Sequence, residues 1–231
     1  MSAGVILIAA GGNTTTWPNS PYYYPEVDML PLPARYNGVL AIGASHDGAT
    51  LADEVRSSYS LYVSDAEQKN VLVVAPVDGS SLNVYTTKLN GYDPTFNGTS
   101  AACPMVAGVV ALMLSVNPTL TYSQISSALS ATAEKIGPYQ YSGGRTAEVG
   151  YGRINAYKVL KYILEHYGGT LSQNMTIPSG ETWTFSPGVT LKFAPGTSLT
   201  SYGNIQAVGT GSGTNQKITL LPLKTRMPKR P

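Results

Sequence analysis

The sequence predicts an α/β fold with a parallel sheet and flanking helices, followed by a small all-β appendage. Three short runs of consecutive apolar residues are typical of strands that are covered on both faces. Three longer segments between residues 99 and 167 have the pattern of helices. From residue 170 onward the sequence changes to short segments in which apolar and polar residues alternate, separated by Pro-Gly and Gly turns. This pattern is typical of short strands. We therefore divide the chain into residues 1–168, 169–222 and 223–231.

The three predicted core strands are residues 4–10, 38–44 and 71–76, and each is rich in β-branched or small apolar residues. Such strands belong to parallel sheets that lie between layers of helices. The first run stops at Gly11-Gly12-Asn13, which places Asn13 at the carboxyl end of its strand. Open α/β sheets form their ligand crevices at this edge, so Asn13 is a candidate site residue.

The first predicted helix carries a candidate nucleophile. Pro104 is tolerated only in the first turn of a helix, so this helix should begin near Thr99 or Ser100. It continues as an almost uninterrupted apolar run to Val116, and a helix that is apolar all round is predicted to be buried. The positive end of the helix dipole and its free N–H groups would face whatever the Ser100 hydroxyl attacks.

Two further helices follow. Thr121 and Gln124 have the spacing of a capping box, and this helix should run to about Ala133. The last helix begins after Asn155 and ends at Gly168-Gly169.

Composition excludes several classes of partner. A net charge of +2 with 12% charged residues offers no basic stripe for nucleic acid, and no apolar run reaches the roughly 20 residues that a membrane span needs. We therefore expect no nucleic-acid partner and no membrane span. The abundance of Gly, Pro, Ser, Thr and Tyr favours a secreted or cell-surface protein. The single cysteine, Cys103, excludes an internal disulfide, and we interpret it as a small core side chain.

The stretch around Ser100 resembles the nucleophile signature of the subtilisin-like serine proteases (subtilases, peptidase S8 family). The matching residues are Gly98, Thr99, Ser100, Ala102, Pro104, Val106, Ala107 and Gly108. Ala101 stands where methionine is usual in the family, and Met105 stands where histidine often follows the proline. The resemblance covers roughly residues 3–165, and it implies the C-terminal part of a subtilisin-like three-layer catalytic domain. The alternative is an Ala/Gly-rich core helix that is merely capped by Thr99 or Ser100.

The resemblance also implies roles at the end of the first strand. The residues from Ala9 to Asn13 match the subtilase segment whose asparagine amide helps to form the oxyanion hole. Removal of that donor costs about 3–4 kcal/mol of transition-state stabilisation in a well-studied subtilase. By the same resemblance, Ala9, Ala10 and Gly11 would line the substrate-specificity pocket. Taken alone, Asn13 could instead form an Asx turn after the strand.

The resemblance implies a serine endopeptidase that forms an acyl-enzyme on Ser100 and acts on polypeptide substrates. The family's catalytic order is Asp, His, Ser, and the Asp and His segments are missing from this sequence. His46 lies in Ser45-His46-Asp47-Gly48, which we interpret as a solvated turn and not as the site of the general base. We therefore expect this chain to be inactive alone, with an unpaired edge on its first strand.

The sequence also allows one alternative function. A pseudo-protease remnant could act as a surface-binding or partner-binding module. An α/β-hydrolase is excluded because no Gly-x-Ser-x-Gly elbow surrounds Ser100. The family resemblance makes structural calcium an option, but no cluster of ligands in the sequence is specific enough to name, and we identify no other cofactor.

Residues 169–222 form the predicted β-rich appendage. The phrase Pro-Gly-x-[Thr/Ser]-Leu occurs at residues 187–191 and again at 195–199. It resembles the opening coil of β-helix modules attached to bacterial surface proteins, and a β-sandwich is the alternative. We expect this part to contact a cell surface or further domains. Residues 223–231 hold four positive charges and no hydrophobic period, which predicts a disordered basic tail.

Overall fold

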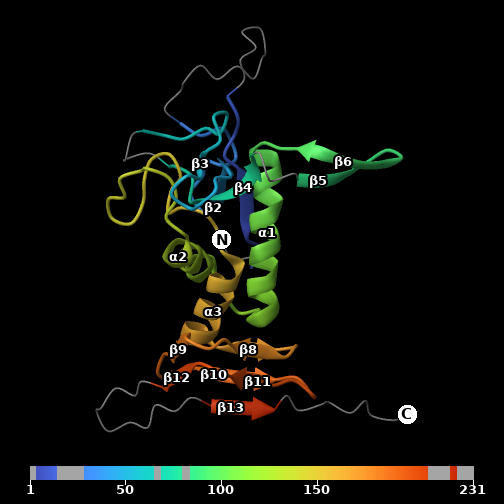
Figure 1. The fold of residues 1–231 in the computed structure, drawn as a ribbon, viewed down its shortest axis with the longest axis vertical. Helices are drawn as coiled ribbons and strands as arrows, with labels where there is room; N and C mark the ends of the chain where they lie inside the picture. Colours follow the sequence, from blue (N-terminus) through green and yellow to red (C-terminus); the bar gives the residue numbers. More distant parts are fainter. Residues whose placement is uncertain (1–3, 15–28, 65–68, 80–83, 208–218, 223–231) are drawn as a thin grey trace. The chain divides into compact units, whose positions relative to one another are not determined.

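The computed structural model describes residues 4–14, 29–64, 69–79 and 84–207, together with the backbone of residues 219–222 (Figure 1). The chain forms two compact units. One contains residues 1–110 and 121–155, and the other contains residues 111–120 and 156–231. Each unit is described on its own below. The predicted tail at residues 223–231 lies outside the described residues.

The first unit is built on a four-stranded sheet. Its strands are β1 (Leu7–Ala10), β2 (Val39–His46), β3 (Val55–Arg56) and β4 (Val73–Asp78). Strands β1 and β4 both pair with β2 in parallel, which confirms the predicted parallel sheet. The short β3 pairs with the end of β2 in antiparallel orientation.

Strand β2 is longer than the sequence predicts, and this changes the position of His46. Ser45 pairs with Arg56, and His46 pairs with both Val55 and Asp78. His46 is therefore the last residue of a strand. The prediction that it lies in a turn was wrong. The ladder continues because β3 and β4 both supply backbone partners at this point.

Two helices begin where the sequence predicts. Helix α1 (Thr99–Val116) starts at Thr99, and α2 (Tyr122–Thr132) follows the N-cap Thr121. The capping box is present, since the Thr121 N–H donates to Gln124 Oε1 at 2.9 Å and the Gln124 N–H donates to Thr121 Oγ1 at 3.3 Å. A hairpin of β5 (Val84–Lys88) and β6 (Gly91–Phe96) leads into α1, and the sequence analysis did not anticipate it.

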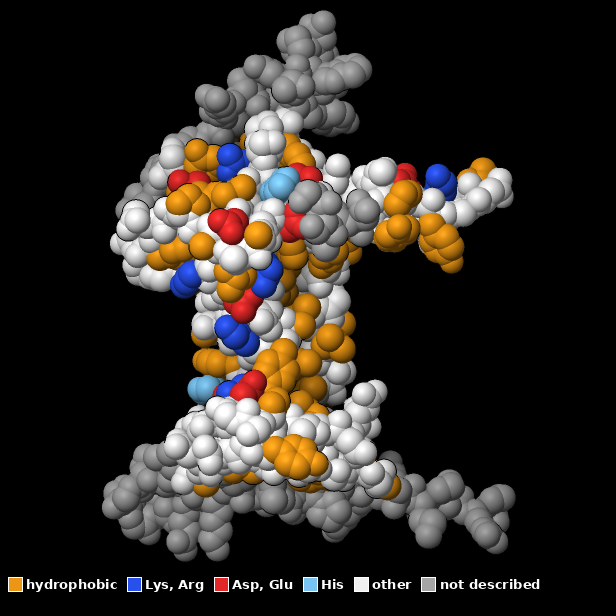
Figure 2. All heavy atoms as spheres, in the orientation of Figure 1, with side chains coloured by type: hydrophobic (Ala, Val, Ile, Leu, Met, Phe, Trp, Pro, Cys, Tyr) orange, Lys and Arg blue, Asp and Glu red, His pale blue; other side chains and the backbone are white. Residues whose placement is uncertain are grey.

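Helix α1 is not buried all round, so that prediction was wrong. Val106 and Val110 lie on a buried stripe, whereas Met105 is 36% exposed and Leu112 is 48% exposed. Figure 2 shows hydrophobic side chains gathered over α1. The described residues cover only one face of the helix. Apolar side chains are also present on the face that they leave exposed.

An ion-pair network joins Arg153 to two acids within the first unit. Arg153 donates to Glu54 Oε2 at 2.9 Å and to Glu134 Oε2 at 2.6 Å. Glu54 is 2% exposed, and its other carboxylate oxygen accepts a 2.6 Å hydrogen bond from the Ser45 hydroxyl. Because both acids are paired and hydrogen-bonded, the network can tolerate its burial.

The second unit combines α3 (Ala156–Tyr167) with short strands that all pair in parallel. The strands are β7 (Gly169–Leu171), β8 (Met175–Ile177), β9 (Thr182–Phe185), β10 (Thr190–Phe193), β11 (Leu199–Ser201), β12 (Asn204–Ala207) and β13 (Thr219–Pro222). Gly169 pairs with Leu191 and Thr182 pairs with Asn204, and each pair is 22 residues apart.

This arrangement is that of successive coils of a β-helix, whereas a β-sandwich is built from antiparallel sheets. The core of the coils holds Ile177, Trp183, Phe185 and Leu191, each at most 2% exposed. Helix α3 and residues 111–120 group with these coils in the second compact unit.

Candidate active site

Asn13 and the start of α1 lie against each other, although they are far apart in the chain. Asn13 follows the carboxyl end of β1, as the sequence predicts. Its Oδ1 accepts two hydrogen bonds from Thr99, one from the backbone N–H at 3.1 Å and one from the hydroxyl at 2.8 Å. Thr99 is the residue immediately before Ser100, so the two predicted site residues belong to one local structure.

These two bonds fix the orientation of the Asn13 amide. A backbone N–H can only donate, so the Asn13 atom that faces Thr99 must be the oxygen. The amide nitrogen is therefore turned the other way, and no hydrogen-bond acceptor for it is found among the described residues. A half-buried amide donor held in this way is ready for an acceptor that carries negative charge.

Gly98 makes this arrangement possible. Its φ is +89°, a conformation that other residues rarely adopt, and a Cβ at this position would lie 2.9 Å from Asn13 Nδ2. The Gly98 N–H donates to the Tyr59 hydroxyl at 3.1 Å. The Gly98 carbonyl accepts from the N–H groups of Ala101 and Ala102, which closes the first turn of α1.

Thr99 joins the two sides of the site. It is 1% exposed, and its Oγ1 accepts from the Gly12 N–H at 3.2 Å while donating to Asn13. The sequence analysis considered Thr99 as part of the nucleophile motif and as a helix start or cap, but it assigned Thr99 no contact with Asn13 and did not consider Tyr59. The position of Thr99 beside Ser100 was a usable signal, whereas nothing in the sequence indicates that Tyr59 meets this turn.

Ser100 is exposed at the N-terminal turn of α1. No described side chain forms a hydrogen bond with its hydroxyl. A helix N-terminus carries a partial positive charge, so it favours negative charge developing nearby. The arrangement therefore offers a hydroxyl nucleophile beside an oriented amide donor and a helix N-terminus.

No hydrogen bond between a histidine and the Ser100 hydroxyl is present among the described residues. His46 Nδ1 lies 2.8 Å from the Asp47 carbonyl oxygen. His166 belongs to the second unit, where its Nδ1 lies 3.0 Å from the Tyr162 carbonyl oxygen and its ring stacks on that of Tyr162 at 3.9 Å. A serine hydroxyl is a weak nucleophile without an adjacent base.

The predicted specificity residues lie at the end of β1. Ala9 is 8% exposed, and the Gly11 N–H donates to the Ile42 carbonyl at 2.7 Å. A Cβ on Gly11 would lie 3.0 Å from Ile42 O and from the Val71 side chain. A larger residue would therefore disturb this strand end. That Ala9, Ala10 and Gly11 contact substrate stays a prediction.

Two other chemistries find little support among the described residues. Cys103 is a half-buried free thiol, and burial raises its pKa, which disfavours the reactive thiolate. In the described part of the chain, no three His, Cys, Asp or Glu side chains group together as metal ligands.

Helix α1 passes a simple test for a membrane-spanning segment, with 18 residues and a mean hydropathy of 1.9. Core helices of soluble proteins pass the same test. The hydrogen bond from the Thr99 hydroxyl to Asn13 and the one from the Gly12 N–H to Thr99 tie the first turn of α1 to the end of β1. These contacts favour α1 as a helix that packs within the folded domain over α1 as a membrane-spanning segment.

Comparison with known proteins adds independent support. The model of the subtilase family, peptidase S8, matches residues 1–152. The chain is 33% identical to subtilisin DY of Bacillus licheniformis over 142 residues, which cover 62% of this chain and 44% of that protein. It is 30% identical to a calcium-dependent protease of Nostoc sp. (strain PCC 7120) over 179 residues, which cover 69% of this chain and 25% of that protein.

A solved structure is also similar. Fervidolysin from Fervidobacterium pennivorans, a keratinolytic enzyme related to subtilisin, matches with a TM-score of 0.50 and 23% identity, over 75% of this chain and 25% of that one. The likeness supports the predicted subtilisin-like fold class. The chain spans less than half the length of each of these relatives. The nucleophile motif, the parallel sheet and the family match agree, and the chain belongs to the subtilase family of serine proteases.

Proposed function

We propose that this chain supplies the nucleophile and oxyanion half of a subtilisin-type endopeptidase site. Ser100 Oγ would attack a peptide carbonyl carbon and lose its proton to a base, while Asn13 Nδ2 donates to the resulting oxyanion. Return of the proton to the leaving amine gives an acyl-enzyme on Ser100, which water then hydrolyses. The observation that carries this proposal is the pair of hydrogen bonds from Thr99 that turns the Asn13 amide nitrogen away from Thr99.

We propose that the base comes from polypeptide outside this sequence, because no hydrogen bond joins a histidine to the Ser100 hydroxyl in the described part of the chain. Loss of a triad member reduces turnover by about 10⁴- to 10⁶-fold in enzymes of this type, so we propose that the chain alone is essentially inactive. Two apolar surfaces that no described residue covers favour a covering segment. One is the region of β1, where Val5 is 59% and Leu7 is 45% exposed, and the other is the outer face of α1.

Family membership also supports a polypeptide substrate and a secreted or cell-surface location. The relative from Nostoc is described as calcium-dependent, and we extend a structural role for calcium to the complete protease without assigning ligands here. The parallel coils of the second unit would then serve as an appendage that contacts a surface or further domains.

A pseudo-protease is the second candidate, and the absence of a hydrogen-bonded base beside Ser100 among the described residues favours it. In that case the oriented amide and the exposed hydroxyl would be remnants, and the coils would carry the function. The two candidates differ in whether the complete protein makes Ser100 nucleophilic.

A fluorophosphonate probe separates these candidates, because it reacts only with an activated serine. In the complete gene product we expect rapid labelling that Ser100→Ala abolishes and Asn13→Ala slows about 10²- to 10³-fold. The 231-residue chain alone should be labelled only very slowly.

Ser123 provides a matched control, since it is exposed and is also the second residue of a helix, α2. Ser123→Ala should leave labelling unchanged. Absence of labelling in the complete product would favour the pseudo-protease. Rapid labelling of this chain alone would contradict our claim that its base is missing.

A further inference from the structure

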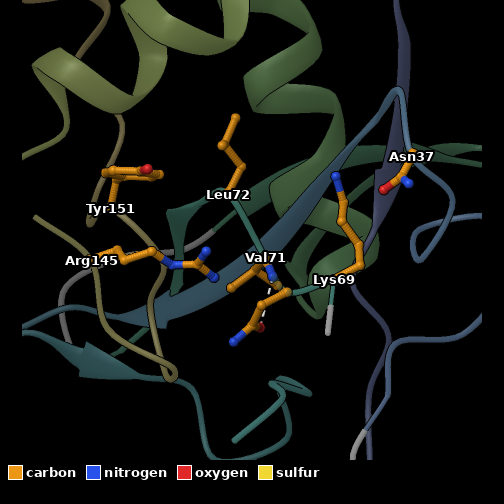
Figure 3. A pocket seen from close by; sticks show the side chains of 7 residues that line it. Asn37, Lys69, Val71, Leu72, Arg145 and Tyr151 are labelled. Carbon is orange, nitrogen blue, oxygen red and sulfur yellow. Dashed lines mark hydrogen bonds between the residues drawn. The ribbon is translucent and has the colours of Figure 1, made fainter. Parts of the chain in front are cut away.

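The two ends of the parallel strands in the first unit carry different polar features. At the amino ends of β2 and β4 lies a cavity of about 310 Å³ that is lined in part by Asn70 (Figure 3). The candidate site lies at the other end, since Asn13 follows the carboxyl end of β1. A residue that adjusts the geometry around Ser100 is therefore expected at this second end, where residues 59–61 run beside residues 12–14.

A short segment holds the backbone on both sides of Asn13. The Thr14 N–H donates to the Tyr59 carbonyl at 2.7 Å, and the Leu61 N–H donates to the Gly12 carbonyl at 2.9 Å. The Thr14 hydroxyl donates to the same Tyr59 carbonyl at 3.3 Å. The residues before and after Asn13 are therefore both bonded to the segment that carries Tyr59.

This segment is itself fixed to β2. The buried Ser60 hydroxyl accepts from the Ala44 N–H, within β2, at 3.0 Å. Arg56 Nη1 donates to the carbonyl oxygens of Ser57 and Ser58 at 3.0 and 3.2 Å, and also to that of Ser60. The guanidinium thus binds several carbonyls of one turn, and the backbone of the segment is held in place before any substrate arrives.

The Tyr59 side chain reaches the other half of the candidate site. Its hydroxyl accepts from the Gly98 N–H at 3.1 Å, and Gly98 lies two residues before Ser100. The carbonyl and the hydroxyl of Tyr59 thus contact the two separate segments that carry Asn13 and Ser100. A tyrosine side chain has a rigid ring, so the distance from its backbone to its hydroxyl varies little. Tyr59 therefore acts as a spacer between the two segments.

Gly98 needs such a restraint, because it has no side chain to limit its conformation. Its φ is +89°, and a Cβ at this position would lie 2.9 Å from Asn13 Nδ2. Rotation of the peptide group before Gly98 would change this close approach. It would also move the first turn of α1, where the Ala101 N–H donates to the Gly98 carbonyl at 2.9 Å. The Tyr59 hydroxyl restrains that peptide group, whereas Thr99 restrains the Asn13 side chain.

We propose that Tyr59 is a positioning residue of the candidate active site. Its hydroxyl holds the Gly98 peptide group so that Ser100 Oγ reaches the substrate carbonyl carbon while Asn13 Nδ2 reaches the carbonyl oxygen. A misplacement of about 1 Å in a catalytic site can slow a reaction about 10²-fold, and the loss of one supporting hydrogen bond should have a smaller effect. This inference rests on the proposed function.

Fluorophosphonate labelling of the complete gene product tests this role. Tyr59→Phe keeps the ring and removes only the hydroxyl. We expect the maximal labelling rate to fall about tenfold, while the probe concentration that gives half of this rate changes less than about twofold. A variant that merely folds less well would show a smaller labelled fraction and an unchanged rate for the folded protein. That result would overturn the proposal.

Tyr141→Phe is the matched control. The Tyr141 hydroxyl also accepts a backbone N–H at 3.1 Å, that of Ile136, and Tyr141 is half-buried like Tyr59. Its partner lies in the loop after α2. Tyr141→Phe therefore removes the same kind of hydrogen bond and should leave the labelling rate unchanged. Equal rates for Tyr59→Phe and Tyr141→Phe would also overturn the proposal.

Hydrogen exchange measured by NMR on the 231-residue chain separates this inference from the proposed function. In Tyr59→Phe we expect the Gly98 N–H to exchange at least tenfold faster and the Asn13 side-chain amide signals to shift. Tyr141→Phe should change neither. These changes without any labelling of the complete product would support the restraint by Tyr59 and contradict the proposed function. Unchanged exchange at Gly98 in Tyr59→Phe would overturn the inference itself.

Discussion

Thr99 is the residue on which the geometry of the candidate site depends most. Its backbone N–H and hydroxyl both bind Asn13 Oδ1, and its Oγ1 also accepts from Gly12. The sequence identified Ser100 and Asn13 because their flanking residues form long, specific patterns. It did not identify the role of Thr99, because that role depends on a contact between residues 86 positions apart.

We expect Thr99→Val to lower the free energy of unfolding by about 1–3 kcal/mol, because valine keeps the shape but removes the hydroxyl from a buried position. Thr99→Ser keeps the hydroxyl and should lose less than Thr99→Val. Urea unfolding of the two variants makes this comparison. A Thr99→Val variant as stable as the unsubstituted chain would show that the hydroxyl does not stabilise the site.

Arg153 is a second residue that links separate parts of the first unit. It joins Glu54, next to β3, to Glu134, which follows α2. Arg153→Met would leave Glu54 buried without its cation, and we expect a loss of about 3–5 kcal/mol in the free energy of unfolding.

Lys88→Met, which removes an exposed cation, should change stability by less than about 0.5 kcal/mol. Chemical denaturation of both variants measures the difference. Equal stability of Arg153→Met and Lys88→Met would mean that the buried network is not needed to hold these elements together.

At the scale of elements, the strands and helices with strong local signals were placed correctly. The first strand, however, is not covered on both faces as predicted, since Val5 is 59% and Leu7 is 45% exposed. Continuous apolar runs gave the parallel strands, Pro104 gave the start of α1, and the capping box gave the start of α2. The β5–β6 hairpin was missed because its strands are mostly exposed and lack a regular apolar alternation. The uncovered face of α1 was missed because composition does not tell which faces have neighbours.

The exposed apolar residues at β1 should make this chain prone to self-association. No described strand pairs with the outer edge of β1, and unpaired edges are templates for intermolecular pairing. We expect Leu7→Lys to reduce the oligomeric fraction in size-exclusion chromatography with light scattering.

Leu51→Lys is the matched control, since Leu51 is 37% exposed but lies in a turn. It should leave the oligomeric fraction unchanged. Equal effects of the two substitutions would indicate general hydrophobic association and not pairing through the β1 edge.

At the scale of the whole molecule, the sequence predicted the α/β class and the subtilase family, and the β-rich character of the C-terminal part. It left open whether the final strands form a helix of coils or a sandwich, because strand pairing depends on residues about 22 positions apart. It also did not predict that α3 groups with the coils. Local sequence patterns specify single helices and strands. Which of them pack into one compact unit depends on contacts between side chains that are far apart in the sequence.

The account as a whole depends on Ser100 and Asn13 serving the same oxyanion. A crystal structure of the complete protease after reaction with a fluorophosphonate measures this directly. We predict a phosphorus atom bonded to Ser100 Oγ, with its phosphoryl oxygen about 3 Å from Asn13 Nδ2. A phosphoryl oxygen that points away from Asn13, or an adduct on a residue other than Ser100, would contradict the account.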